Sequence, residues 1–476
     1  MKLLNNRSNR WIRLVGYLLL LMGLFLSSRC LLGRDAPAVF NEKGNLRETK
    51  GDVPARESVN MTNSSAAAGS PRVELPAKEE DQMTIIEQKV KDDLKENELN
   101  KNIWVGTWGS AQLTAADETL PPKPGLAGNT YRQGLRVSIG GSLIRLKFSN
   151  EFGAEPLEIE AAYIAKLLEY GGSKIDPKSS TAITFQGGKR RITIPAGKTI
   201  TSDPIPFELK VLDYVAVTTL FGKVPASITS HTASRSMNYL TVGNHVLDEV
   251  FDNYQTATSW YFLSDIDVYT IPEHFAVVCF GDSLTDGYGV QTNVIQRWTD
   301  LLAERLQEDP ETRHISVINK GIGGNAIFGG NGPAAYKRFL RDVCEPAGVK
   351  YCIMLIGVND IGNTTEDITD SLIGKYEEMI KTAHSYGIKV YGGTITPVEG
   401  HYYYSDLHEE IRRKMNSWIM SGKSGLDGVI DFAAALAEPA RPSRMQARYA
   451  NDYLHPSAAG YVCMAELIDL AIFKDR

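Results

Sequence analysis

The feature that most constrains this chain is the apolar run at residues 275–280, which is followed at once by Gly-Asp-Ser at residues 281–283. An apolar run of this length that ends in glycine and aspartate is typical of a buried strand that breaks into a turn. A helix is predicted from about Val294. Open α/β sheets bind their ligands beyond the carboxyl ends of the strands, so we expect the Ser283 hydroxyl at that edge. A serine there acts as a nucleophile only with a base and oxyanion donors nearby.

Three later segments contain residues of those kinds. A strand-like run at 315–318 is followed by a glycine-rich turn at 319–325, and a second run at 351–356 is followed by Gly-Val-Asn-Asp. Near the C-terminus, Asp452 precedes His455 by three residues. At that spacing, the carboxylate can accept from one ring nitrogen and leave the other nitrogen to face a serine.

In this order, the four segments resemble the conserved blocks of the SGNH, or GDSL-type, hydrolases, a family of esterases, acetylesterases, lipases and thioesterases. The resemblance implies that Ser283 is the nucleophile, that His455 is the general base and that Asp452 orients His455. It also implies an oxyanion hole formed by the Ser283 N–H, the Gly324 N–H and the side-chain amide of Asn359.

Each segment alone also has a simpler interpretation. The turn at residues 281–283 could be only a capping turn, because aspartate and serine favour such sites. The Asp452/His455 pair could be a surface hydrogen bond, and the glycines at 321, 323 and 324 could form a plain tight turn. Within the proposed oxyanion hole, Gly323 is the alternative to Gly324. The occurrence of all four segments in one chain favours the hydrolase.

The length of 476 residues predicts two folded domains with appendages. We expect a signal peptide or N-terminal anchor at residues 1–32 and a disordered linker with a short charged helix at 33–100. A β-sandwich domain is predicted at 101–270 and an SGNH hydrolase domain at 271–476. The net charge of −6 argues against nucleic acid as the main partner.

Basic residues followed by an uncharged apolar run at 14–26 are typical of a secretory leader. The run is short for a spanning helix, so contact with a membrane is expected only through an uncleaved N-terminal anchor. Cys30 suggests a lipoprotein site, but Arg29 stands where such sites usually have a small residue. We therefore predict a secreted or cell-surface protein.

Alternating apolar residues predict two hairpins, one over 135–148 and one over 183–194, each with a Gly-Gly turn. Short strands at this spacing predict an antiparallel sandwich of the jelly-roll kind. Residues 104–108 and 149–153 resemble an N-terminal β-domain of an SGNH subgroup that includes acylhydrolases of plant-polysaccharide degraders. Trp104, Trp108 and Trp260 are either a sugar-stacking platform or part of the sandwich core.

Beyond residue 271, strands starting near 275, 315, 351, 388 and 428 alternate with helical stretches, which predicts a doubly wound parallel sheet. The resemblance implies five strands in the flavodoxin-like order 2-1-3-4-5. The helices are expected at 297–306, 368–384, 407–420 and 458–473.

Other chemistries fit the sequence poorly. Thr285 replaces the second glycine of a Gly-x-Ser-x-Gly elbow, and Thr292 interrupts a dinucleotide-binding pattern. His401 and His408 near Asp406 match no standard metal site, so we expect neither a metal nor another cofactor. The remaining cysteines, at 279, 344, 352 and 463, are expected to be buried free thiols, because two of them fall inside predicted strands.

The resemblance implies an exported serine esterase that removes short acyl groups, acetyl above all, from plant polysaccharides such as xylan. The expected partner is therefore an acylated polysaccharide or small molecule. Two alternatives remain open at this point. One is a lipase or phospholipase, and the other is a glycan-binding surface protein with an inactive hydrolase domain.

Overall fold

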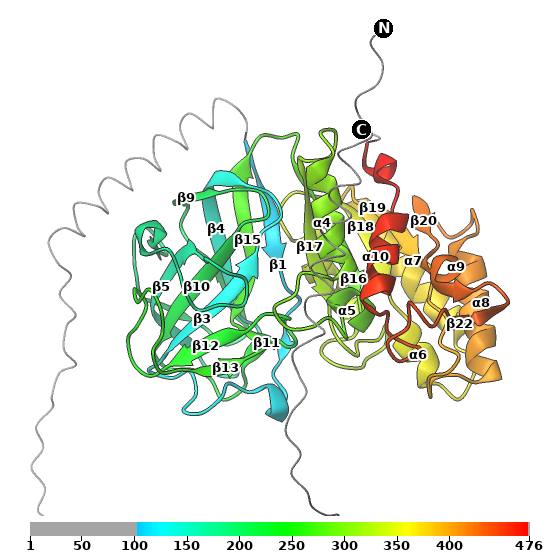
Figure 1. Cartoon of the computed structure of the whole chain (residues 1–476), viewed down its shortest axis with the longest axis horizontal. Coiled ribbons are helices and arrows are strands. Elements are labelled where there is room, and N and C mark those ends of the chain that lie inside the picture. Colours follow the sequence, from blue (N-terminus) through cyan, green and yellow to red (C-terminus); the bar gives the residue numbers. More distant parts are fainter. Residues whose placement is uncertain (1–101, 475–476) are drawn as a thin grey trace, which may run out of the picture. The chain divides into compact units, whose positions relative to one another are not determined.

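The computed structural model describes residues 102–474 (Figure 1). The leader, linker and charged helix predicted before residue 101, and Cys30, lie outside the described residues. Within residues 102–474, no helix is both long enough and apolar enough to span a bilayer.

The C-terminal half contains a parallel five-stranded sheet whose order confirms the predicted 2-1-3-4-5 topology (Figure 1). The first strand in the chain occupies a central position, between the second and the third. Across the sheet, the strands are β17 (Ile315–Gly321), β16 (Phe275–Gly281), β18 (Val349–Leu355), β19 (Lys389–Gly393) and β20 (Gly428–Ile430).

Helices alternate with these strands, and the predicted doubly wound arrangement is confirmed. The longer helices are α4 (Trp298–Glu308), α7 (Thr369–Ser385), α8 (Asp406–Ile419) and α10 (Ala458–Leu467). Helices α4 and α10 pack against each other, as do α7 and α8 (Figure 1). The last predicted helix is shorter than expected and is followed by a separate 3-10 turn at Leu470–Phe473. Short helices are α3 (Ser283–Asp286), α5 (Ala335–Phe339), α6 (Val358–Gly362) and α9 (Phe432–Leu436).

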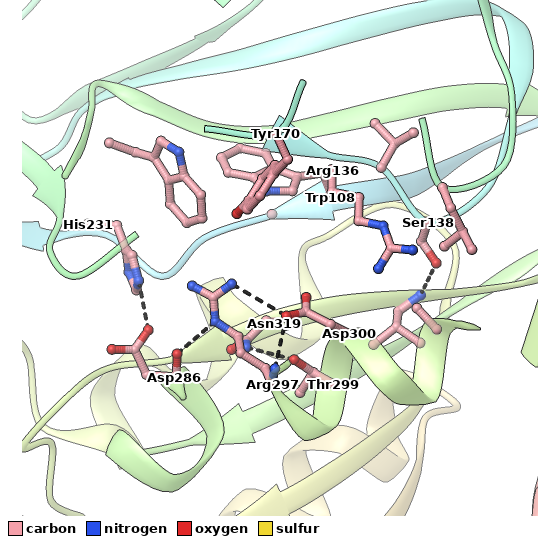
Figure 2. A pocket seen from close by; sticks show the side chains of 16 residues that line it. Trp108, Arg136, Ser138, Tyr170, His231, Asp286, Arg297, Thr299, Asp300 and Asn319 are labelled. Atoms are coloured by element: carbon pink, nitrogen blue, oxygen red, sulfur yellow. Dashed lines mark hydrogen bonds and ion pairs between the residues drawn. The ribbon is translucent and has the colours of Figure 1, made fainter. Parts of the chain in front are cut away.

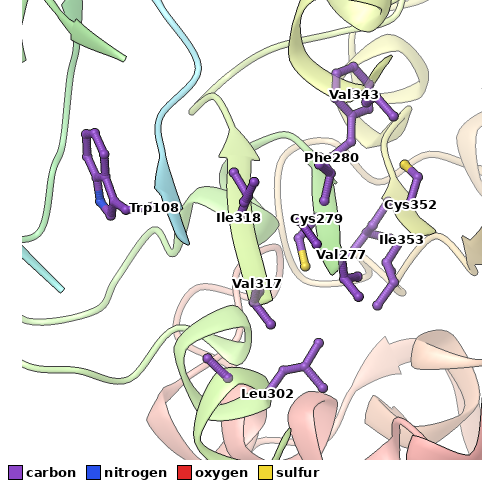
Figure 3. Close-up of a cluster of buried hydrophobic side chains, with 14 of the residues drawn as sticks. Trp108, Val277, Cys279, Phe280, Leu302, Val317, Ile318, Val343, Cys352 and Ile353 are labelled. Atoms are coloured by element: carbon purple, nitrogen blue, oxygen red, sulfur yellow. The ribbon is translucent and has the colours of Figure 1, made fainter. Parts of the chain in front are cut away.

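Strand β16 is buried along its whole length, which explains its continuous apolar sequence. Figure 3 shows Cys279 and Val277 near Val317 and Leu302, while Phe280 lies toward Val343. A strand covered on both faces needs apolar residues at every position, and each fully buried large side chain contributes about 1.5–3 kcal/mol. The sequence run therefore marks the centre of the hydrolase half.

The N-terminal half consists of antiparallel strands in two larger sheets and one small sheet. The first sheet contains β1 (Ile103–Gly109), β15 (Leu263–Thr270), β4 (Gly141–Asn150), β8 (Lys198–Thr201) and β9 (Ile205–Leu209). The second contains β13 (Gln255–Ala257), β12 (Asn238–Thr241), β3 (Thr130–Arg136), β10 (Tyr214–Phe221), β5 (Leu157–Lys166), β6 (Thr181–Ile183) and β7 (Ile192–Ile194). The small sheet contains β14 (Trp260–Tyr261), β11 (Thr229–His231) and β2 (Leu113–Thr114).

The two larger sheets pack face to face as a sandwich. Phe148 of β4 contacts Phe185, which follows β6, and Phe221 of β10 contacts Phe262, immediately before β15. The ring centroids of both pairs are 5.6 Å apart. Each pair joins a residue of one sheet region to a residue of the other, so the apolar faces share one core.

The hairpin predicted over 135–148 is wrong, and the hairpin predicted over 183–194 forms only at its turn, where Phe185 and Lys189 pair across the two glycines. Strand β3 pairs with β10 and β12, whereas β4 pairs with β15, β8 and β9, so the chain crosses from one sheet to the other at the expected turn. Strands β6 and β7 each pair with β5 rather than with each other. Alternation identifies which face of a strand is buried, but it does not identify the partner strand.

Of the three tryptophans that could form either a sugar-stacking platform or part of the sandwich core, two lie in the core. Trp108 and Trp260 are buried and pack edge to face, with ring centroids 5.0 Å apart. Trp104 is half-buried beside Tyr269 and lies under the guanidinium of Arg145. Trp108 and Trp260 therefore stabilise the sandwich and present no stacking surface.

The sandwich and the parallel sheet are joined by buried polar contacts. The N–H of Gly106 in β1 donates to the carbonyl of Ala347 over 2.9 Å. Lys320 in β17 contacts Asp265 in β15, with Nζ to Oδ1 at 2.6 Å, and both side chains are largely buried. Such contacts fix the sandwich against the hydrolase half and allow its loops to reach the edge of the parallel sheet.

The four described cysteines, Cys279, Cys344, Cys352 and Cys463, are all unpaired. Cys279 and Cys352 are buried in β16 and β18, as expected for thiols that act as small apolar side chains. Cys344 and Cys463 are partly exposed, which differs from the prediction of burial for the whole set.

Candidate active site

Ser283 is the first residue of α3, directly after the central strand β16. The carboxylate of Asp282 caps this short helix by accepting from the Leu284 N–H over 3.0 Å. The helix lies close to the end of β17: a Cβ added at Gly321 would be only 2.3 Å from the Asp286 nitrogen. Glycine at position 321 therefore permits the close approach that holds the Ser283 turn at the edge of the sheet.

The Ser283 hydroxyl is buried and contacts a histidine from the other end of the hydrolase half. Its Oγ lies 2.9 Å from Nε2 of His455. The Nδ1 atom of His455 lies 2.8 Å from Oδ2 of Asp452. The second carboxylate oxygen of Asp452 accepts from the His455 backbone N–H over 2.7 Å. One carboxylate thus fixes both the backbone and the ring of His455, and Nε2 is left facing Ser283.

The electrostatic setting favours a neutral imidazole beside an ionised carboxylate. Burial lowers the pKa of His455 below its ordinary value, although the neighbouring Asp452 opposes this shift. Burial would raise the pKa of Asp452, but the hydrogen bonds from the His455 N–H and ring outweigh it, so the pKa is lowered. Near neutral pH, His455 can therefore accept a proton from the Ser283 hydroxyl.

The predicted oxyanion donors follow the two strands that flank β16. In the sheet, Gly281 pairs with Gly321 on one side and Leu355 on the other, so the turns after these strands meet at one edge. Gly324 has φ +72°, a conformation that favours glycine. Among the described residues, the N–H groups of Ser283, Gly323 and Gly324 have no hydrogen-bond acceptor. Both glycines therefore remain candidate donors.

Asn359 is held in one orientation by two contacts. Its Oδ1 accepts from the Tyr403 hydroxyl over 3.1 Å, and its Nδ2 donates to the Asn325 carbonyl over 2.8 Å. An amide nitrogen has two N–H groups, so one donor is left after the bond to Asn325. The Tyr403 hydroxyl accepts in turn from Asn363 over 3.1 Å. This network orients the remaining Asn359 donor.

Two charged residues that the sequence did not single out also hold the donor loops. Asp360 accepts from the N–H groups of Ile327 and Phe328, at 2.8 and 3.0 Å, and so ties the loop after β17 to α6. The buried guanidinium of Arg338 donates to the carbonyls of Gly281 and Lys320, at the ends of β16 and β17. The sequence could have pointed to Asp360, because it directly follows the predicted oxyanion donor Asn359. Nothing in the sequence around Arg338 connects that residue with the site.

Tyr288 and Arg235 were also missed. The Tyr288 ring lies over His455, with centroids 4.0 Å apart, and the tyrosine is 46% exposed. The guanidinium carbon of Arg235 lies 5.8 Å from the centroid of the Tyr288 ring. Its positive charge also lowers the pKa of His455, after burial and His401. Arg235 belongs to the sandwich, so no local pattern could connect it with Ser283.

A polar cavity lies between the sandwich and α3. Figure 2 shows His231 directed toward Asp286, with Nε2 to Oδ1 at 3.0 Å. Arg297 donates to the Asp286 carbonyl over 2.8 Å, and the His231 ring stacks on Trp260. The cavity measures about 60 Å³, which is room for a few water molecules rather than a sugar. We infer that these contacts hold α3 in place on the side that faces the sandwich.

The histidines considered as metal ligands have other contacts. The ring nitrogens of His408 lie 2.5 Å from the Tyr403 carbonyl and 2.9 Å from the Thr364 carbonyl, so His408 braces two loops. His401 lies in a ring contact with Tyr402, and burial lowers its pKa. Across residues 102–474, no group of three or more His, Cys, Asp or Glu side chains is arranged to hold a metal ion.

Comparison with known proteins identifies this half of the chain. Residues 279–462 match the model of the GDSL-like Lipase/Acylhydrolase family, a range that includes Ser283, Gly324, Asn359, Asp452 and His455. No curated protein matches the chain.

Solved structures of similar proteins cover about two fifths of the chain. A GDSL-like lipase from Bacteroides thetaiotaomicron VPI-5482 is 20% identical, with 43% of this chain and 91% of that chain covered and a TM-score of 0.34. The acetylxylan esterase Axe2 from Geobacillus stearothermophilus is 19% identical, with 40% and 91% covered and a TM-score of 0.32. On the match of the family model, residues 279–462 are a domain of the GDSL-like lipase/acylhydrolase family.

Proposed function

We propose that the protein is a serine esterase that hydrolyses short-chain acyl esters, with Ser283 as nucleophile. The contact of Ser283 Oγ with His455 Nε2 at 2.9 Å, continued by His455 Nδ1 and Asp452 at 2.8 Å, is the observation that supports this most strongly. A hydroxyl, an imidazole and a carboxylate in this order activate a serine for acyl transfer.

In the first step, Ser283 Oγ attacks the ester carbonyl carbon while His455 Nε2 takes the hydroxyl proton. The carbonyl oxygen becomes an oxyanion, which accepts hydrogen bonds from the Ser283 N–H, the Gly324 N–H and the free Asn359 donor. His455 then donates its proton to the leaving alcohol, and the C–O bond breaks. In the second step, water adds to the acyl-Ser283 ester with His455 again as base, and the free acid leaves.

For the substrate, we propose acetyl or other short acyl esters on plant polysaccharides such as xylan. An exposed aromatic ring over His455, and a second one beside the neighbouring His401, support this choice. Tyr288, over the His455 ring, is 46% exposed, and Tyr402, beside His401, is 83% exposed. The C–H faces of sugar rings stack on such rings. Export through the predicted leader, to meet an extracellular polymer, is part of the proposal.

Acetate release from acetylated xylan by the full-length protein tests the proposal. It is measured beside p-nitrophenyl acetate, butyrate and octanoate, with Ser283→Ala as control. We expect Ser283-dependent release of acetate and a preference for the shortest ester. Ser283-dependent activity confined to the longest ester would instead support a lipase. Binding to xylan with no turnover of any ester would support a glycan-binding protein.

A further inference from the structure

The loop between β11 and β12 of the sandwich extends to the edge of the candidate active site. Its residue Arg235 lies with the guanidinium carbon 5.8 Å from the centroid of the Tyr288 ring. The same tyrosine ring covers His455, the partner of Ser283. The Tyr288 ring thus contacts both the cationic side chain of Arg235, from the N-terminal half, and His455 of the Ser283–His455 pair.

Contacts from the hydrolase half hold this loop in an unusual conformation. Ala233 and Arg235 both have positive φ, at 56° and 55°. Residues other than glycine rarely adopt this backbone conformation, and the strain persists only where surrounding contacts impose it. Arg297 donates to the Ser234 carbonyl over 2.7 Å, and the Asn293 N–H donates to the Arg235 carbonyl over 2.9 Å. The backbone on both sides of the Arg235 side chain is therefore fixed.

The guanidinium of Arg235 lacks a partner anion among residues 102–474. It forms no ion pair there, and its buried Nε has no hydrogen-bond acceptor. The buried arginines nearby differ in this respect, because Arg297 pairs with Asp300 and Arg338 pairs with Asp342. An unpaired, half-buried guanidinium retains the planar set of donors that matches a carboxylate.

We propose that Arg235 forms an anionic subsite that binds a carboxylate of the substrate next to the scissile ester. This inference rests on the proposed esterase function and narrows its substrate to acyl esters that carry a negative charge. A uronic acid unit near an O-acetyl group on a polysaccharide has this chemistry. A half-ester of a dicarboxylic acid has the same chemistry on the acyl side.

The test compares each charged ester with a neutral ester that has the same or a similar leaving group, after subtraction of the uncatalysed rate. The substrates are 4-acetoxybenzoate, with its carboxylate on the alcohol side, mono-p-nitrophenyl glutarate, with its carboxylate on the acyl side, and the neutral esters methyl 4-acetoxybenzoate and p-nitrophenyl acetate. Full-length wild type, Arg235→Gln and Arg235→Lys are assayed. Arg191→Gln, which removes an exposed arginine elsewhere on the sandwich, is the matched control. Rates are taken at pH 8, above the ordinary range for histidine, because loss of the Arg235 charge raises the pKa of His455.

We expect Arg235→Gln to lower kcat/KM for one of the charged esters by roughly tenfold or more, with little change for the neutral ones. The ester that loses activity identifies the side on which the carboxylate is bound. Arg235→Lys should retain part of the preference, and Arg191→Gln all of it. In wild type, added salt should weaken the preference, since it screens the charge. This salt test also applies if Arg235→Gln does not fold.

An equal effect of Arg235→Gln on charged and neutral esters would overturn the anionic subsite, as would a wild-type preference insensitive to salt. Either result leaves the esterase proposal intact as long as turnover depends on Ser283. If the wild type hydrolyses none of the four esters, it is the esterase proposal that fails.

Discussion

The Ser283 hydroxyl oxygen lies 2.9 Å from Nε2 of His455, although 172 residues separate the two in the chain. Ser283 follows the central strand β16, and His455 lies just before α10. The Tyr461 hydroxyl of α10 donates to the Tyr288 carbonyl over 2.8 Å, which ties this helix to the segment after α3. The pair therefore depends on the docking of the C-terminal helix as well as on the sheet.

Replacement of Asp452 by asparagine should lower kcat by about a hundredfold or more. The amide cannot stabilise an imidazolium as a carboxylate does, and it no longer fixes the ring with Nε2 toward Ser283. Steady-state hydrolysis of p-nitrophenyl acetate measures the effect. Asp469→Asn, which changes a capping aspartate of the last 3-10 turn, is the control. Activity near that of wild type in Asp452→Asn would remove Asp452 from the mechanism.

The pH dependence of kcat/KM for a neutral ester should show one rising step with a midpoint below the ordinary histidine pKa of about 6.5. Burial lowers the pKa of His455, and the reaction needs its neutral form. Asp452 raises that pKa, so Asp452→Asn should move the step to still lower pH while it lowers the plateau. A midpoint above the ordinary value would contradict the assignment of His455 as the base.

Asn359→Ala should lower kcat by about a hundredfold or more, the usual effect of losing one oxyanion donor. Tyr403→Phe leaves the donor in place but removes the bond that orients it, so we expect a smaller loss, roughly threefold to tenfold. Comparison of kcat and KM separates this effect from substrate binding, because both variants should change KM little. A Tyr403→Phe loss as large as that of Asn359→Ala would argue against this division of roles.

Asp282 should make the protein less stable as the pH rises from about 4 to about 7. Burial raises the pKa of Asp282 to about 7, above its value in the unfolded chain. The folded state then binds the extra proton, so stability from this group is present below about pH 4 and is lost by about pH 7. Asp282→Asn should remove this dependence and change the relative stability between pH 4 and 8 by up to about 4 kcal/mol.

Denaturant unfolding at several pH values measures this effect as the difference between variant and wild type. Asparagine keeps an oxygen that can accept from the Leu284 N–H, so the cap is preserved. Asp431→Asn, at the start of α9, is the control for loss of a capping charge. Parallel pH curves for Asp282→Asn and wild type would mean that folding does not raise the pKa of Asp282.

The parallel sheet and the residues at its edge could be predicted because their signals are local. A strand buried on both faces needs a continuous apolar run, and the turn after it displays its polar residues beside their sequence neighbours. Ser283, Asn359 and the Asp452/His455 pair each stand in such a turn, in the order of the family blocks. The strand order itself came from the resemblance.

The rest depends on contacts between distant segments. The sandwich strands near 135–148 alternate as a hairpin does, but their partners lie in different sheets, and no local pattern encodes that choice. Arg235 and Tyr288 lie together only because the sandwich packs against the hydrolase half. Tyr403 contacts Asn359 from a loop beyond β19, so its hydrogen bond could not be predicted from the sequence either.

The most direct test of the central claim is to identify the residue that forms the acyl-enzyme. The full-length protein is treated with a fluorophosphonate ester, which reacts with activated serines, and is then digested and analysed by mass spectrometry. We predict a single phosphonyl adduct on Ser283, loss of esterase activity in proportion to labelling, and no labelling of His455→Ala. An adduct on another serine with activity lost, or full activity after complete labelling of Ser283, would contradict the account.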